Sequence, residues 1–236
     1  MRTARRQTSA ARSMHGIAEP PPLENGDMLT ATEFLRRYDA MPEVKKAELI
    51  DGIVYMGSPV RAKQHGIPDS HLQCWLVLYS SQTPGTAVAA NSTTRFDVKN
   101  VPQPDAVLLN LTKSGRARIG RDGYIHGAPE LVVEIAASSA SIDLHRKLEA
   151  YRRAGVREYF VWRPTEAIVD WFALDGETYV PLEPDANGVL ASRCFPGLVL
   201  DVQALLRHDI AGVLKRLSRG LGKGAHKAFV AALQNS

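Results

Sequence analysis

Two acidic residues and one lysine have the types and the spacing of a site that cleaves phosphodiesters with a divalent cation. Glu134 lies inside the β-branched run Leu131 to Ile135, which is typical of a buried strand. A carboxylate buried there is costly unless a positive group meets it. Asp105 opens a second apolar run, and Lys147 lies on an expected helix after Glu134. Brought together by a sheet and its adjoining helix, these groups could hold a metal ion and cleave a phosphodiester.

The elements expected around these residues have α/β character. The segment 130–136 predicts a strand, about 141–154 a helix that ends at Gly155, and 158–162 another strand. A strand, a helix and a strand in this order predict a crossover unit. A further strand is expected at 105–109, followed by a hairpin or an irregular loop up to residue 129.

The other expected elements lie on both sides of this unit. Thr30 and Glu33 have the spacing of a capping box and predict a helix near 30–39. Two short strands surround the Asp51-Gly52 turn, and a helix follows Pro68. The rest comprises a strand in 86–98, antiparallel strands near 167–174 and 178–182, and a helical tail from Asp201 that is broken by glycines.

Length and composition favour one globular domain with tails. The 236 residues are 44% hydrophobic and 23% charged, which is ordinary for a folded domain. We expect a disordered basic tail at 1–27, a main domain at 28–205 and a C-terminal helical extension at 206–236. The Arg-rich, acid-poor opening fits either a transit peptide or a misassigned start with Met14 or Met28 as the true one, and the second interpretation is favoured. No apolar run approaches the roughly 18 residues of a membrane span, so we expect a soluble, cytoplasmic protein without a membrane partner.

The formal charge of +4 is explained by the N-terminal tail, because four arginines and no acid lie in its first 18 residues. The segment 207–227 has six basic residues and one acid, Asp209. This segment is either a phosphate-binding surface or a helix face exposed to solvent. The second interpretation is favoured, because charge runs on amphipathic helices usually face water.

Several motifs occur in an order that is specific to one family. They are Glu48-Leu49-Ile50-Asp51-Gly52, Pro104-Asp105, Pro129 to Ile135, Asp143 to Lys147, and Tyr151 to Tyr159. This succession resembles the Uma-type restriction endonucleases of the PD-(D/E)xK nuclease superfamily, over roughly residues 28–205. The resemblance implies a restriction-endonuclease-like α/β core with a mixed β-sheet flanked by helices.

The resemblance also implies the metal ligands. Asp105 and Glu134, on neighbouring strands, would hold Mg²⁺ or Mn²⁺ together with the backbone carbonyl of Ile135, and Glu48 would complete the acidic cluster. Oxygen ligands of this kind suit hard divalent cations.

The resemblance gives Lys147 the role of orienting or activating the attacking water and stabilising the developing charge. The superfamily pattern has its lysine two residues after the acid, where this chain has Ala136. Lys147 fits a lysine that has migrated to the following helix, since a long side chain can deliver its charge from a different Cα.

Each candidate residue also has a structural interpretation. Asp105 could cap a turn, Glu134 could pair with an internal arginine, and Glu48 could be an ordinary acid beside a turn. Lys147 could pair with Asp143, four residues earlier on the same helix. Two further residues are candidates for substrate contact: His65, which could also touch the metal, and Tyr151, which could instead belong to the core.

The leading hypothesis is a metal-dependent DNA endonuclease, and a homodimer would match the two-fold geometry of DNA. The alternative is a catalytically inactive nuclease-fold module that binds nucleic acid or a protein partner. Ala136 in the usual lysine position and the neutral to acidic core favour this alternative. A third hypothesis is an assembly protein that dimerises through its C-terminal helices.

Overall fold

A six-stranded mixed sheet organises the residues that the structure describes, 19–137 and 142–235; the structure is a computed structural model. Its strands β8 and β9 run parallel, whereas its other neighbouring strands run antiparallel. The parallel pair confirms the predicted crossover. In spatial order the strands are β11 (Thr178–Pro181), β10 (Ile168–Asp175), β9 (Glu158–Arg163), β8 (Leu131–Ile135), β5 (Ala106–Asn110) and β3 (Thr86–Ala90).

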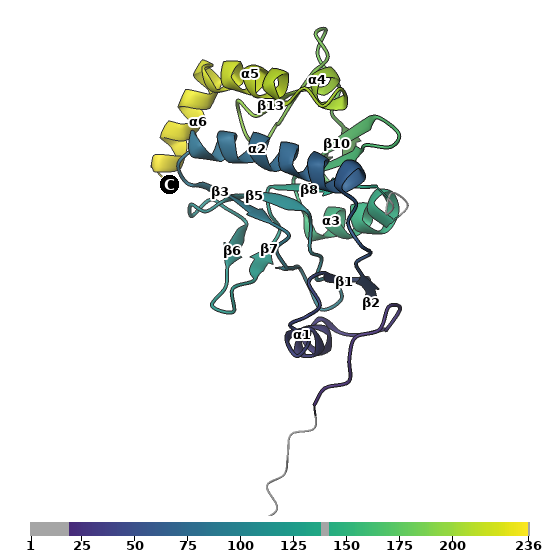
Figure 1. The fold of residues 1–236 in the computed structure, drawn as a ribbon. Coiled ribbons are helices and arrows are strands. Elements are labelled where there is room, and N and C mark those ends of the chain that lie inside the picture. Colours follow the sequence, from purple (N-terminus) through teal and green to yellow (C-terminus); the bar gives the residue numbers. More distant parts are fainter. Residues whose placement is uncertain (1–18, 138–141, 236) are drawn as a thin grey trace, which may run out of the picture.

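Helices cover both faces of this sheet (Figure 1). Helix α2 (Ile67–Ser81), which follows the π-helical segment η1 (Ala62–Gly66), packs on the face that carries Leu131 and Val133. Helix α3 (Leu148–Ala154), which follows the π-helical segment η2 (Ile142–Lys147), packs on the face that carries Val132. Since side chains of a strand alternate between faces, Glu134 belongs to the α3 face.

The C-terminal helices are part of the core. Helices α4 (Val202–Leu206), α5 (Ile210–Leu221) and α6 (Gly224–Gln234) follow one another, and α5 lies beside α2 (Figure 1). Val213 and Leu217 of α5 are fully buried in the cluster that includes Trp75 of α2. The expected extension at 206–236 therefore shares the core of the main domain.

The N-terminal part follows its local sequence patterns. Helix α1 (Ala31–Asp39) begins after Thr30, whose Oγ1 accepts the N–H of Glu33. Strands β1 (Ala47–Ile50) and β2 (Ile53–Met56) form a hairpin whose turn residues Asp51 and Gly52 both have positive φ. Of the expected tail, residues 1–18 lie outside the described residues, and the remainder packs on the domain through Leu23, which is 4% exposed.

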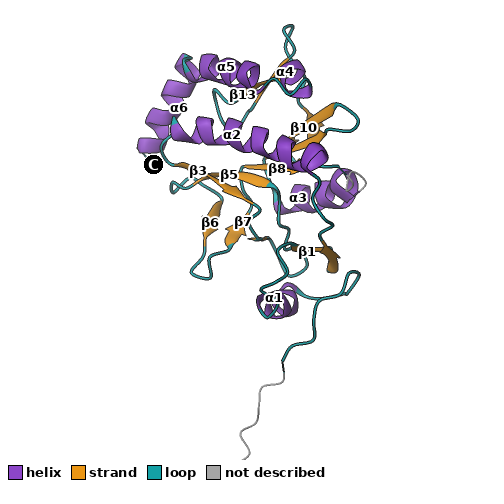
Figure 2. Ribbon diagram, in the orientation of Figure 1, coloured by secondary structure: helices purple, strands orange, loops and turns teal. Residues whose placement is uncertain are grey.

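Several elements differ from the sequence prediction. The strand expected in 86–98 is interrupted at Asn91, whose φ is 47°, so β4 (Thr94–Arg95) joins a separate sheet with β6 (Ala117–Ile119) and β7 (Ile125–Gly127). Strands β12 (Val189–Ala191) and β13 (Val199–Asp201) were not predicted. Figure 2 shows the resulting distribution of helices, strands and loops. Within the described ranges, no helix is long and apolar enough to cross a membrane.

Candidate active site

The ends of β5 and β8 bring the two strand carboxylates to the same edge of the sheet. Ala106 of β5 is paired with Val133 of β8 in an antiparallel register. Continuing this register by one residue places Asp105 opposite Glu134, and opposite residues of an antiparallel pair project from the same face. Asp105 Oδ2 also accepts the backbone N–H of Ile135 at 2.8 Å. This bond fixes the orientation of the Asp105 carboxylate beside β8.

Glu134 receives two donors from the helical segment that follows it. Its Oε1 accepts a hydrogen bond from Lys147 Nζ at 3.0 Å and another from the Tyr151 hydroxyl at 2.7 Å. Lys147 and Tyr151 are four residues apart and so lie on one face of the helix. Glu134 is 2% exposed, and these donors stabilise its burial.

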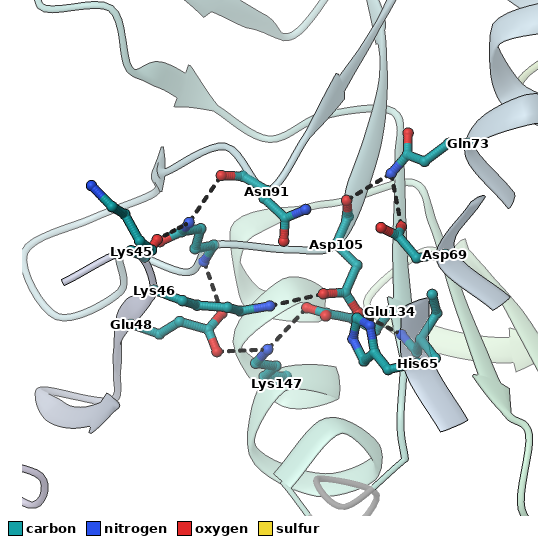
Figure 3. A network of polar contacts seen from close by, with 12 residues as sticks. Lys45, Lys46, Glu48, His65, Asp69, Gln73, Asn91, Asp105, Glu134 and Lys147 are labelled. Carbon is teal, nitrogen blue, oxygen red and sulfur yellow. Dashed lines mark hydrogen bonds and ion pairs between the residues drawn. The ribbon is translucent and has the colours of Figure 1, made fainter. Parts of the chain in front are cut away.

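Glu48 of β1 completes the acidic cluster. Its Oε2 lies 2.8 Å from Lys147 Nζ, and its Oε1 accepts the backbone N–H of Gln103 at 2.8 Å. The Lys147 ammonium group contacts two carboxylates, and the residue is only 4% exposed, so both ion pairs are shielded from water (Figure 3). Segments that are far apart in the sequence meet at this ammonium group.

Asp105 has two cationic partners of its own. Lys46 Nζ lies 2.8 Å from Oδ1, and His65 Nε2 lies 3.3 Å from Oδ2. Burial raises the pKa of Asp105, but the hydrogen bond with His65 and the charge of Lys46 outweigh it and hold the pKa below its ordinary value. The hydrogen bond with Asp105 raises the pKa of His65.

Lys46 was missed by the sequence analysis. Burial lowers its pKa, but the charges of Asp105, Glu134 and Glu48 more than compensate, so the pKa is raised. Lys46 precedes Glu48 by two residues, and the period of two in a strand places both on one face. That spacing is the local pattern that could have identified it.

Two glutamines that support the site were also missed. Gln103 is 5% exposed, and its side chain donates to the carbonyls of Lys45 and Asn91. Gln73 of α2 donates to the carbonyl of Asp105 at 3.0 Å and to the carboxylate of Asp69 at 3.0 Å. No spacing in the sequence identifies either residue, because their partners come from other elements.

The structure thus brings together four candidate residues, Asp105, Glu134, Glu48 and Lys147, with His65 beside them (Figure 3). Tyr151, the other expected substrate contact, is fully buried in the apolar cluster on the α3 face, and its hydroxyl donates to Glu134.

Three other residues that the sequence singles out lie on β8, directly after it, or on η2. Ala136, in the usual lysine position, is buried in the apolar cluster on the α3 face. The carbonyl of Ile135 accepts the N–H of Ala137 at 3.1 Å. The alternative partner of Lys147, the side chain of Asp143, lies outside the described residues.

The donor set fits a hard divalent cation that keeps part of its hydration shell. Within the described part of the chain, no group of three or more His, Cys, Asp or Glu side chains is placed to hold a metal ion. Mg²⁺, however, commonly uses one or two protein carboxylates, with waters and substrate phosphates as its other ligands. Asp105, Glu134 and the carbonyl of Ile135 are oxygen donors of this kind, and the cluster of three carboxylates and two ammonium groups keeps one net negative charge.

Comparisons with known proteins identify a family and a fold. The family model Uma2, described as "Putative restriction endonuclease", matches residues 31–203. A crystal structure of "a putative nuclease belonging to DUF820" from Anabaena variabilis superposes with a TM-score of 0.58 and 18% identity, covering 76% of this chain and 98% of that chain. At this identity the similarity shows the fold alone, which is of the restriction-endonuclease-like α/β type. No curated protein matches the chain.

Proposed function

The chain belongs to the Uma2 family, whose model carries the description "Putative restriction endonuclease", and we propose that it is a metal-dependent endonuclease that hydrolyses phosphodiester bonds in DNA. The observation that supports this proposal is the convergence of Asp105 and Glu134 at one edge of the sheet, with Lys147 held between Glu134 and Glu48. Acidic oxygen donors with an adjacent ammonium group match the requirements of phosphodiester hydrolysis.

Asp105, Glu134 and the carbonyl of Ile135 would hold Mg²⁺ or Mn²⁺, with Glu48 as the third acid of the cluster. The bound cation would supply concentrated positive charge to the phosphate group. Lys46 and Lys147 now neutralise the same carboxylates at 2.8 and 3.0 Å. Their long, flexible side chains allow each ammonium group to shift away from a carboxylate and toward a substrate.

Lys147 is the proposed catalytic lysine. Its ammonium group is buried, and electrostatic interactions are stronger there than in bulk water. It can therefore stabilise the negative charge that develops on the phosphate and orient the attacking water. Tyr151 positions Glu134, and the N–H of Gln103 positions Glu48. His65, on η1 and partly exposed, is the proposed substrate contact.

A specific observation supports the alternative of an inactive nuclease-fold module. Asp105, Glu134 and Glu48 each contact an ammonium group, and Ala136 occupies the usual lysine position. In this alternative the ion pairs only stabilise the fold, and the domain binds nucleic acid or a protein partner without cleaving it.

Plasmid nicking in Mg²⁺ or Mn²⁺ separates the two functions. We expect nicking by the wild type, its abolition by EDTA, and its loss in Asp105→Asn and Glu134→Gln. Asp175→Asn, at the exposed end of β10, is the matched control and should retain activity. Nicking that persists in both site variants contradicts the proposed site.

Calorimetric Mn²⁺ binding that requires Asp105 and Glu134 argues against the inactive module. Light scattering tests the proposed homodimer, which a two-fold DNA target would favour.

A further inference from the structure

A second charged site lies away from the carboxylates, in a hollow of about 440 Å³ between α5 and the strands β11, β12 and β13. This volume is in the range of small-molecule sites in proteins. Four basic side chains line it: Arg193, Arg216, Arg219 and Lys223. The hollow belongs to the side of the protein built by α5, whereas Glu134 lies on the α3 face.

The helix geometry explains why these cations converge. Arg216 and Arg219 are three residues apart on α5, which places them on one face of the helix. Lys223 lies between α5 and α6 and also lines the hollow. The neighbouring stripe of α5, which includes Leu217, is buried in the core and fixes the rotation of the helix. Arg193 approaches from the loop between β12 and β13. Charges from two separate segments therefore face the same space.

The positive charge of the hollow is only partly compensated. Among the described residues, none of its four basic side chains forms an ion pair within 4.0 Å. Two acids, Glu183 and Asp185, also line it. Asp185 Oδ1 already accepts the backbone N–H groups of Asn187 and Val189 at 2.8 and 3.0 Å, so this oxygen is engaged in its own turn.

The lining combines these charges with an apolar surface. Leu182, Val189 and Val199 contribute apolar side chains beside the arginines. Phosphate groups are recognised by arginine through paired, charge-assisted hydrogen bonds, and a sugar or base can pack on apolar side chains. We propose that this hollow binds the phosphate groups of a nucleotide, supplied either as a free nucleotide or as part of a nucleic-acid strand. The site is separate from the proposed cleavage site and does not depend on it.

The test measures binding by the full chain in EDTA, where no metal-dependent cleavage can occur. Two probes are used: ADP, followed by calorimetry, and a fluorescein-labelled single-stranded DNA of about 12 nucleotides, followed by anisotropy. The variant carries Arg216→Gln and Arg219→Gln. The charge-matched control carries Lys215→Gln and Lys227→Gln, which remove two exposed charges that do not line the hollow.

We expect the arginine variant to bind at least one probe about tenfold or more weakly, whereas the lysine control stays within about twofold of the wild type. Loss of ADP binding identifies a free nucleotide as the ligand. Loss of DNA binding alone identifies a nucleic-acid strand as the ligand. In that case the slope of log K against log salt concentration should also decrease in magnitude by about 1.4, because two phosphate contacts are lost. Equal losses in the two variants, or no binding of either probe by the wild type, overturn the proposal. If the arginine variant does not fold, the same assays are made with Arg193→Gln. Affinities for both probes that equal those of the wild type would then overturn the proposal.

Discussion

Lys147→Met is the most direct perturbation of the site, because Nζ of Lys147 joins two carboxylates from different parts of the chain. It lies 2.8 Å from Glu48 and 3.0 Å from Glu134, and the residue is 4% exposed. Methionine keeps a flexible apolar side chain of similar length but removes the charge. The variant therefore isolates what the ammonium group contributes.

Removal of this charge should tighten metal binding. A divalent cation held by Asp105 and Glu134 would be repelled by the Lys147 ammonium group. At a separation of about 4 Å, a unit charge and a divalent ion repel by about 2 kcal/mol even in the dielectric of water. Because about 1.4 kcal/mol corresponds to a factor of ten, we expect Mn²⁺ to bind at least about tenfold more tightly to Lys147→Met than to the wild type.

The same variant should be less stable without metal. Loss of one partner from a buried ion pair costs about 3 to 5 kcal/mol. We expect a loss near 3 kcal/mol, because Tyr151 still donates to Glu134 and the N–H of Gln103 still donates to Glu48. Mn²⁺ at about 100 times its dissociation constant should return about 2.7 kcal/mol. In EDTA, the urea midpoint of the variant should therefore lie well below that of the wild type. In Mn²⁺, the midpoint of the variant should rise to near that of the metal-free wild type.

The rate of DNA cleavage by Lys147→Met should fall, although its affinity for metal rises. If Lys147 stabilises the developing phosphate charge, its loss should slow plasmid nicking by about 100-fold or more. Calorimetry with MnCl₂, urea unfolding with and without Mn²⁺, and nicking rates measure the three effects. Lys113→Met, at an exposed position, is the control and should leave all three unchanged. A Lys147→Met protein that binds Mn²⁺ with wild-type affinity and cuts DNA at the wild-type rate would refute the reasoning.

Three further predictions test charge and packing. The folded-state pKa of Asp105 is lowered, so its carboxylate stabilises the fold at pH values above the unfolded-state pKa of about 3.9, and this stabilisation is lost as the pH falls. In urea unfolding, the difference in stability between the wild type and Asp105→Asn should therefore shrink between pH 6 and pH 3. A difference that stays constant over this range would contradict the prediction. In Lys46→Met, burial should raise the pKa of Asp105, so the acid limb of the nicking profile should move to higher pH. Gly220→Ala should cost about 1 to 3 kcal/mol because a Cβ would lie 2.3 Å from the Gly197 carbonyl oxygen, whereas Gly222→Ala, with neighbours at 3.6 Å or more, should cost clearly less in thermal unfolding.

The parts of the fold that were predicted correctly depend on local chemistry. Residues 131–135 form a continuous apolar run except for one acid, as expected for a strand buried on both faces. Gly155 ends the following helix with a φ of 81°, a conformation that glycine adopts at little cost. The Asp51-Gly52 turn closes the predicted hairpin in the same way. In each case, neighbouring residues contain the information that determines the element.

The missed features depend on contacts between distant segments. The ion pair of Lys46 with Asp105 joins residues that are 59 positions apart, and it forms because β1 pairs through Leu49 with Val101, in the segment before β5. Strands β12 and β13 are three residues long, too short for a clear hydrophobic period. The loop between them is attached to β9 by the buried carboxylate of Glu158, which accepts the N–H of Cys194 at 2.8 Å. No local pattern specifies such partners.

The charge balance of the site explains how a lysine on the helix can serve in place of one on the strand. Asp105, Glu134 and Glu48 with Lys46 and Lys147 carry one net negative charge. A divalent cation would change this charge to positive, and a phosphodiester group would then return it to zero. An ammonium group contributes equally to this balance from any Cα, provided that Nζ reaches the carboxylates. Lys147 meets this condition from helical segment η2, so the buried Ala136 is free to pack in the apolar core without loss of the positive charge.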